Sequence, residues 1–125
     1  MEALISGFAQ VALASAEPKA LVAYYRDVVG LPFLFEAGGM HFLQAGPSRL
    51  MIYGADAPHS LADGTIVYLE PSDWNAAEAK LEAKGAAFAH GAQVVMREPG
   101  RELALRPFTD PEGHKLALMG WRPAA

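Results

Sequence analysis

The strongest constraint on the fold of this chain is a repeat of its hydrophobic and turn pattern. In the first half, a strand-like alternation over residues 8–15 precedes a helical pattern that Gly30 ends, and three short strand candidates follow. The same order starts again at residue 65, and Gly85 ends the second helical pattern. The sequence therefore predicts two modules, about 6–54 and 64–122, joined by a loop over residues 54–63 within one domain, 1–125.

Each module is expected to contain one strand, one helix and then three strands. Pro18 suits the first turn of the first helix, and the run from Pro71 to Asp73 supplies the start of the second. The later strand candidates are bounded by glycine and proline turns. They cover residues 33–36, 40–44 and 49–53 in the first module, and 88–97, 102–108 and 115–121 in the second.

Composition excludes several classes of function. The 125 residues are 52% hydrophobic and 19% charged, which suits a packed core. The net charge of -4 and the absence of a Lys/Arg run argue against a nucleic-acid partner, and the lack of cysteine excludes disulfides and thiol chemistry. No apolar run is long enough to predict a membrane span, and Glu2 stands where a signal peptide needs a basic residue. The sequence predicts a cytoplasmic protein.

Two motifs resemble one protein family. Residues 24–31, YYRDVVGL, are similar to the "FYRDVLGL" helix end, and residues 109–114, TDPEGH, are similar to the "DPDG" turn before the last strand. Both are typical of the glyoxalase, bleomycin-resistance and extradiol-dioxygenase superfamily, the vicinal oxygen chelate fold. The resemblance implies an α+β fold of two βαβββ modules, with a curled mixed sheet around a ligand cleft, helices on the outer face, and a homodimer.

Strand alternation and the resemblance together select the candidate binding residues. Alternation turns Gln10 toward the cleft, places Met51 and Tyr53 on one face of their strand, and turns Thr65 and Ala117 inward. In metal-dependent relatives, histidines and glutamates occupy the positions that match Gln10, Thr65, Ala117 and Met51. Because these residues are poor ligands for a divalent ion, we expect no metal. The sequence contains no Gly-rich phosphate loop, so we expect no other cofactor either.

Three further residues are candidates, and His41 and Arg106 have two interpretations each. His41 can point into the cleft or lie away from it. Arg106 and Phe108 share a face of their strand, where the guanidinium can bind a carboxylate or phosphate. The alternative for Arg106 is an ion pair with Glu102 or Glu112.

These observations favour a small-molecule-binding protein that holds an organic ligand without a metal. The alternative is a metal-dependent lyase, isomerase or dioxygenase of the same superfamily. A third interpretation is a metal-free enzyme that uses His41, Tyr53 or Arg106. The pattern identifies no catalytic residue.

Overall fold

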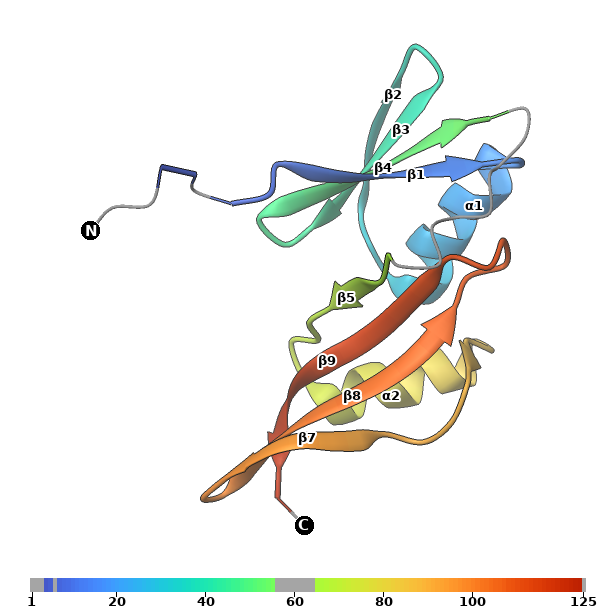
Figure 1. The fold of residues 1–125 in the computed structure, drawn as a ribbon. Coiled ribbons are helices and arrows are strands. Elements are labelled where there is room, and N and C mark those ends of the chain that lie inside the picture. Colours follow the sequence, from blue (N-terminus) through green and yellow to red (C-terminus); the bar gives the residue numbers. More distant parts are fainter. Residues whose placement is uncertain (1–3, 6, 56–64, 125) are drawn as a thin grey trace. The chain divides into compact units, whose positions relative to one another are not determined.

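A computed structural model describes residues 4–5, 7–55 and 65–124 of the chain. The residues divide into two compact units, Met1–His59 and Ser60–Ala125, and each is described by itself. Each unit contains a mixed β-sheet with a helix against one of its faces (Figure 1). The structure therefore has the α+β class that the sequence predicts. Most of the connector expected over residues 54–63 lies outside the described residues.

The first unit follows the predicted order of one strand, one helix and three strands. Its sheet has the order β1-β4-β3-β2, in which β1 runs parallel to β4 and the other pairs are antiparallel. The elements are β1 (Gln10–Ser15), α1 (Pro18–Tyr24), a π-helical turn η1 (Tyr25–Val29), β2 (Phe33–Ala37), β3 (Met40–Ala45) and β4 (Ser48–Gly54).

Helix α1 covers one face of this sheet. Pro18 occupies its first turn, where a missing N–H leaves no hydrogen bond unmade. Gly30 ends the helical segment with a φ of 87°, a conformation that costs glycine little. Leu21 and Ile52 are almost fully buried, and burying such a side chain contributes about 1.5–3 kcal/mol. This core fixes which face of the sheet stays open.

The second unit repeats the scheme with one correction. Its sheet has the order β5-β9-β8-β6, and β7 also pairs with β8. The predicted strand over residues 88–97 is wrong, because two short strands pair with opposite ends of the long β8 and residues 89–92 separate them. The elements are β5 (Val67–Leu69), α2 (Trp74–Ala83), β6 (Ala87–Phe88), β7 (Gln93–Glu98), β8 (Arg101–Thr109) and β9 (Lys115–Pro123).

Helix α2 begins at a side-chain cap and packs closely on β9. Asp73 accepts a hydrogen bond of 2.9 Å from the backbone N–H of Ala76, which satisfies a donor of the first turn. Trp74 is buried, and a Cβ at Gly120 would lie only 3.0 Å from the Cδ of Pro71. A side chain at residue 120 would therefore require the start of the helix to move by a few tenths of an ångström.

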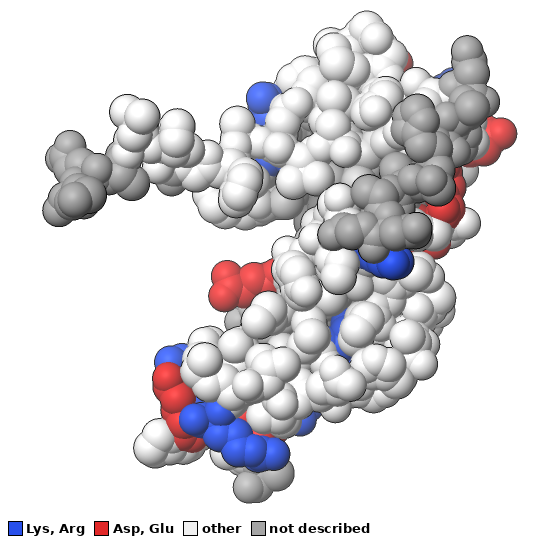
Figure 2. Space-filling view, viewed as in Figure 1, with Lys and Arg blue, Asp and Glu red and all other residues white. Residues whose placement is uncertain are grey.

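Charged residues gather at the turn end of β7 and β8 (Figure 2). The carboxylate of Glu102 is buried and accepts hydrogen bonds of 2.9 Å from both Arg97 and Arg122. Arg101 pairs with Glu98 at 2.8 Å on the more exposed side. Because two guanidinium groups satisfy Glu102, this carboxylate anchors the hairpin to β9.

Among the described residues, neither α1 nor α2 has the length or apolar character of a membrane-spanning helix.

Candidate functional site

One face of the first sheet is not covered by α1, and we call it the open face. The register places Ala12 and Phe42 on either side of Met51, and Met40 beside Tyr53. The opposite face contains the buried aliphatic residues that meet α1. The open face is formed by Gln10, Ala12, Ala14, Phe35, Ala37, Met40, Phe42, Gln44, Arg49, Met51 and Tyr53. Gln10, Met51 and Tyr53 thus share one face, as their alternation predicts.

A hollow of about 790 Å³ lies at one end of the first unit. Its floor includes Met51 and Tyr53 from β4 and Met40 from β3, all of which belong to the open face. The C-terminal ends of β1 and β4 meet here, together with the start of α1 and the turn between β2 and β3. The lining consists of Glu17, Pro18, Lys19, Gly38, Gly39, Met40, His41, Met51, Tyr53 and Gly54. This volume lies within the range of sites for small organic ligands.

His41 borders the hollow from the other side of the sheet. It pairs with Ile52, which is buried under α1, so it shares the helix-covered face and not the face of Met51. Its exposed fraction is 8%. His41 therefore lies at the margin of the hollow, whereas Met51 and Tyr53 belong to its floor.

Sequence reasoning gave no binding role to two residues of the open face, Arg49 and Phe42. The Cζ of Arg49 lies 5.2 Å from the centre of the Phe42 ring, and its Nη2 donates to the Oε1 of Gln10 at 3.4 Å. Phe42 also stacks on Phe35, with ring centres 4.6 Å apart. The sequence did contain a signal for Arg49, because alternation along the strand places it on the same face as Met51 and Tyr53.

A second, smaller hollow of about 280 Å³ lies on the second unit. The register places Tyr68 and Pro107 on either side of Ala117, and the Tyr68 side chain is half exposed. Phe108 borders this hollow but is 1% exposed and contacts Phe88, so it belongs mainly to the core. The lining consists of Ile66, Tyr68, Ala89, Leu105, Pro107, Phe108, Thr109, Lys115, Leu116 and Ala117.

The placement predicted for Thr65 is wrong. Thr65 precedes β5 and does not line the second hollow, whereas Ile66 and Tyr68 do. The reason is the parallel register, which pairs Val67 with Leu116 on the helix-covered face and Tyr68 with Ala117 on the other. Thr65 therefore does not occupy the place in the second sheet that Gln10 occupies in the first.

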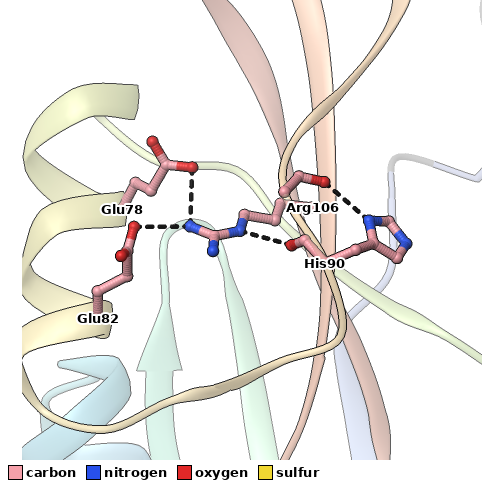
Figure 3. A network of polar contacts seen from close by, with 5 residues as sticks. Glu78, Glu82, His90 and Arg106 are labelled. Carbon is pink, nitrogen blue, oxygen red and sulfur yellow. Dashed lines mark hydrogen bonds and ion pairs between the residues drawn. The ribbon is translucent and has the colours of Figure 1, made fainter.

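Arg106 faces α2 and not the wall that contains Ala117 (Figure 3). Its Nη1 lies 2.7 Å from Glu82 and 3.0 Å from Glu78, and its Nε donates to the His90 carbonyl at 2.9 Å. The Cζ lies 3.9 Å from the centre of the Phe88 ring. The pairing predicted with Glu102 or Glu112 is also wrong, since α2 supplies the carboxylates. Arg106 ties α2 to β8 and to the loop after β6.

The TDPEGH motif forms a turn held by one carboxylate. The Oδ1 of Asp110 accepts hydrogen bonds from the backbone N–H groups of Glu112 at 2.9 Å and His114 at 3.0 Å. The Nδ1 of His114 lies 2.7 Å from the Oδ2 of Asp110, and both residues are buried. The motif therefore fixes the entry of the chain into β9.

The residues at the family's metal positions do not fit a divalent cation. Met51 and Ala117 offer no hard donor atom, and Arg49 places a positive charge beside the amide oxygen of Gln10. In the parts of the chain that the structure describes, no three His, Asp or Glu side chains are grouped as metal ligands would be. The open face therefore presents two amides, a guanidinium and an apolar surface.

Comparisons with known proteins agree on the fold. The family model described as glyoxalase/bleomycin resistance protein/dioxygenase superfamily matches residues 7–118. Among solved structures, lactoylglutathione lyase from Agrobacterium tumefaciens is 22% identical with a TM-score of 0.70, over 94% of this chain and 96% of that one. TioX from Micromonospora sp. ML1 is 20% identical with a TM-score of 0.72, over 92% and 98%. No curated protein has a significantly similar sequence.

Proposed function

Since the chain belongs to the glyoxalase/bleomycin resistance protein/dioxygenase superfamily, we propose that it is a small-molecule-binding protein that works without a metal ion. Its ligand is an organic molecule held on the open face of the first sheet. The observation that carries this proposal is the hollow of about 790 Å³ whose floor includes Met40, Met51 and Tyr53.

The chemistry of the open face supports an apolar ligand with a polar group. Phe35 and Met40 are 44% and 39% exposed, although burying such side chains is favourable. Methionine side chains adapt to irregular ligands, and Tyr53 combines an apolar ring with a hydroxyl that can donate or accept. A ligand bound here would cover apolar surface of the protein and could form one or two hydrogen bonds, for example with the Tyr53 hydroxyl.

The residues at the family's metal-ligand positions support ligand binding over metal-assisted catalysis. A metal-dependent lyase, isomerase or dioxygenase of this superfamily would need charged or imidazole ligands where this chain has Gln10, Met51 and Ala117. The guanidinium of Arg49 beside Gln10 adds electrostatic repulsion toward a cation. We propose that the protein acts as a cytoplasmic homodimer, in which the exposed strand β2 is one edge that a second chain can cover.

A ligand screen with mapped variants tests the proposed function. Aromatic antibiotics and short-chain carbonyl compounds are screened for a rise in melting temperature, because a ligand that binds only the folded state stabilises it. For each hit, Met51→Ala should weaken binding about tenfold, and Tyr53→Phe should weaken it when the hydroxyl is used.

The matched control is Met96→Ala, which removes an exposed methionine from β7 in the second unit and should leave affinity unchanged. Equal affinity of the parent and Met51→Ala for every hit would show that the ligand binds elsewhere.

A further inference from the structure

Arg49 differs from the other arginines of the chain in its partners. Of the six arginines, five form ion pairs with carboxylates, and the partners of these five are Asp27, Glu78, Glu82, Glu98 and Glu102. Arg49 donates instead to the neutral amide of Gln10. Within the described ranges 4–5, 7–55 and 65–124, no carboxylate lies within ion-pair distance of it. Its positive charge is therefore not compensated by a neighbouring side chain there.

The charge of Arg49 stands above an aromatic surface. Its guanidinium covers the Phe42 ring at 5.2 Å, and Phe42 in turn stacks on Phe35 with an angle of 26° between the rings. Phe35 remains 44% exposed on the edge strand. Phe42 itself is buried beneath these two neighbours, so a planar molecule can stack only on the exposed Phe35 ring, next to the site of the guanidinium.

Arg49 does not line the hollow, but it shares the open face with a residue that does. Arg49 and Met51 are two residues apart on the same face of β4, which corresponds to about 7 Å along a strand, and Met51 lines the hollow. The Oε1 of Gln10 accepts from Arg49, so the amide nitrogen of Gln10 remains a second donor at this position. A guanidinium and an amide N–H side by side match the two oxygens of a carboxylate.

We propose that the ligand of the open face is a planar aromatic anion whose carboxylate binds Arg49 and Gln10. Its ring system stacks toward Phe35 and extends over Met51 into the hollow. This inference rests on the proposed function and adds the charge and the shape of the ligand. A cationic aromatic ligand is disfavoured at this position by repulsion from Arg49.

Three matched probes separate charge from shape in the full chain. They are 2-naphthoate, its neutral amide 2-naphthamide, and the cation 2-naphthylmethylammonium, each titrated while amide chemical shifts are followed by NMR. We expect 2-naphthoate to bind at least about tenfold more tightly than the amide and to shift the signals of Gln10, Phe42 and Met51. The cation should bind most weakly.

Two variants and one control assign the preference to Arg49. Arg49→Gln should bind the carboxylate and the amide equally, whereas Arg49→Lys should keep a reduced preference for the carboxylate. The control is Arg26→Gln, which removes an exposed arginine of the same unit that pairs with Asp27. It should keep the full preference of the parent.

The outcomes distinguish the two proposals. Equal affinity of the parent for naphthoate and naphthamide, or an unchanged preference in folded Arg49→Gln, would overturn the inference and leave the proposed function standing. No shift on the open face with any of the three probes, together with no hit in the ligand screen, would overturn both.

Discussion

Replacing Arg106 should destabilise the second unit, because this residue holds α2 to the sheet. Arg106→Met keeps an apolar stem against Phe88 but removes the guanidinium. The change loses the contacts with Glu78 and Glu82 and the hydrogen bond to the His90 carbonyl. The Arg106 side chain is only 14% exposed, so water replaces these partners poorly. The substitution also leaves Glu78, whose side chain is 23% exposed, without its cation.

The expected loss follows from these contacts. Hydrogen bonds to charged groups contribute about 1.5–3 kcal/mol when they are shielded, and exposed ion pairs contribute about 0–1 kcal/mol. The Glu82 contact is the shorter, but the Glu82 side chain is 53% exposed, so Glu78 should contribute more. We expect a total loss of about 2–4 kcal/mol in the free energy of unfolding, or roughly 6–15 °C in melting temperature.

Thermal and urea denaturation of the parent and Arg106→Met measure this loss. Arg26→Met, which removes a half-exposed arginine paired with an exposed Asp27, should leave the melting temperature nearly unchanged. Double-mutant cycles with Glu78→Gln and Glu82→Gln divide the effect between the two carboxylates. A loss in Arg106→Met no larger than in Arg26→Met, or a larger coupling to Glu82 than to Glu78, would refute this reasoning.

Three further predictions concern packing, assembly and metal content. Gly120→Ala should lower stability by about 1–3 kcal/mol in urea denaturation, because its Cβ would lie 3.0 Å from Pro71; an unchanged midpoint would mean that the helix start moves freely. Light scattering at micromolar concentration should give about twice the chain mass of 13.3 kDa, and a clean monomer would contradict the homodimer. Elemental analysis of protein purified without added metal should find no stoichiometric transition metal; one ion per chain would overturn the proposed metal-independent function.

The sequence by itself predicted the features that depend on neighbouring residues. The repeat of strand, helix and strands was readable because strand and helix periodicities are local and because Gly30 and Gly85 end their helices. The common face of Met51 and Tyr53 was also predictable, since alternation within a strand fixes relative side-chain direction, and alternation with the apolar Val11 and Leu13 turned Gln10 away from the helix. The two family motifs identified the superfamily and therefore the fold.

Only the tertiary structure decided the features that depend on pairing between distant segments. Thr65 was assigned to the wrong position because the register of β5 is set by β9, which lies far along the chain. The partners of Arg106 come from α2, and no local pattern shows which charged residue a folded sheet brings within 3 Å. That no carboxylate among the described residues pairs with Arg49 is likewise seen only in the folded chain, because ion pairs depend on distances through space and not on spacing along the sequence.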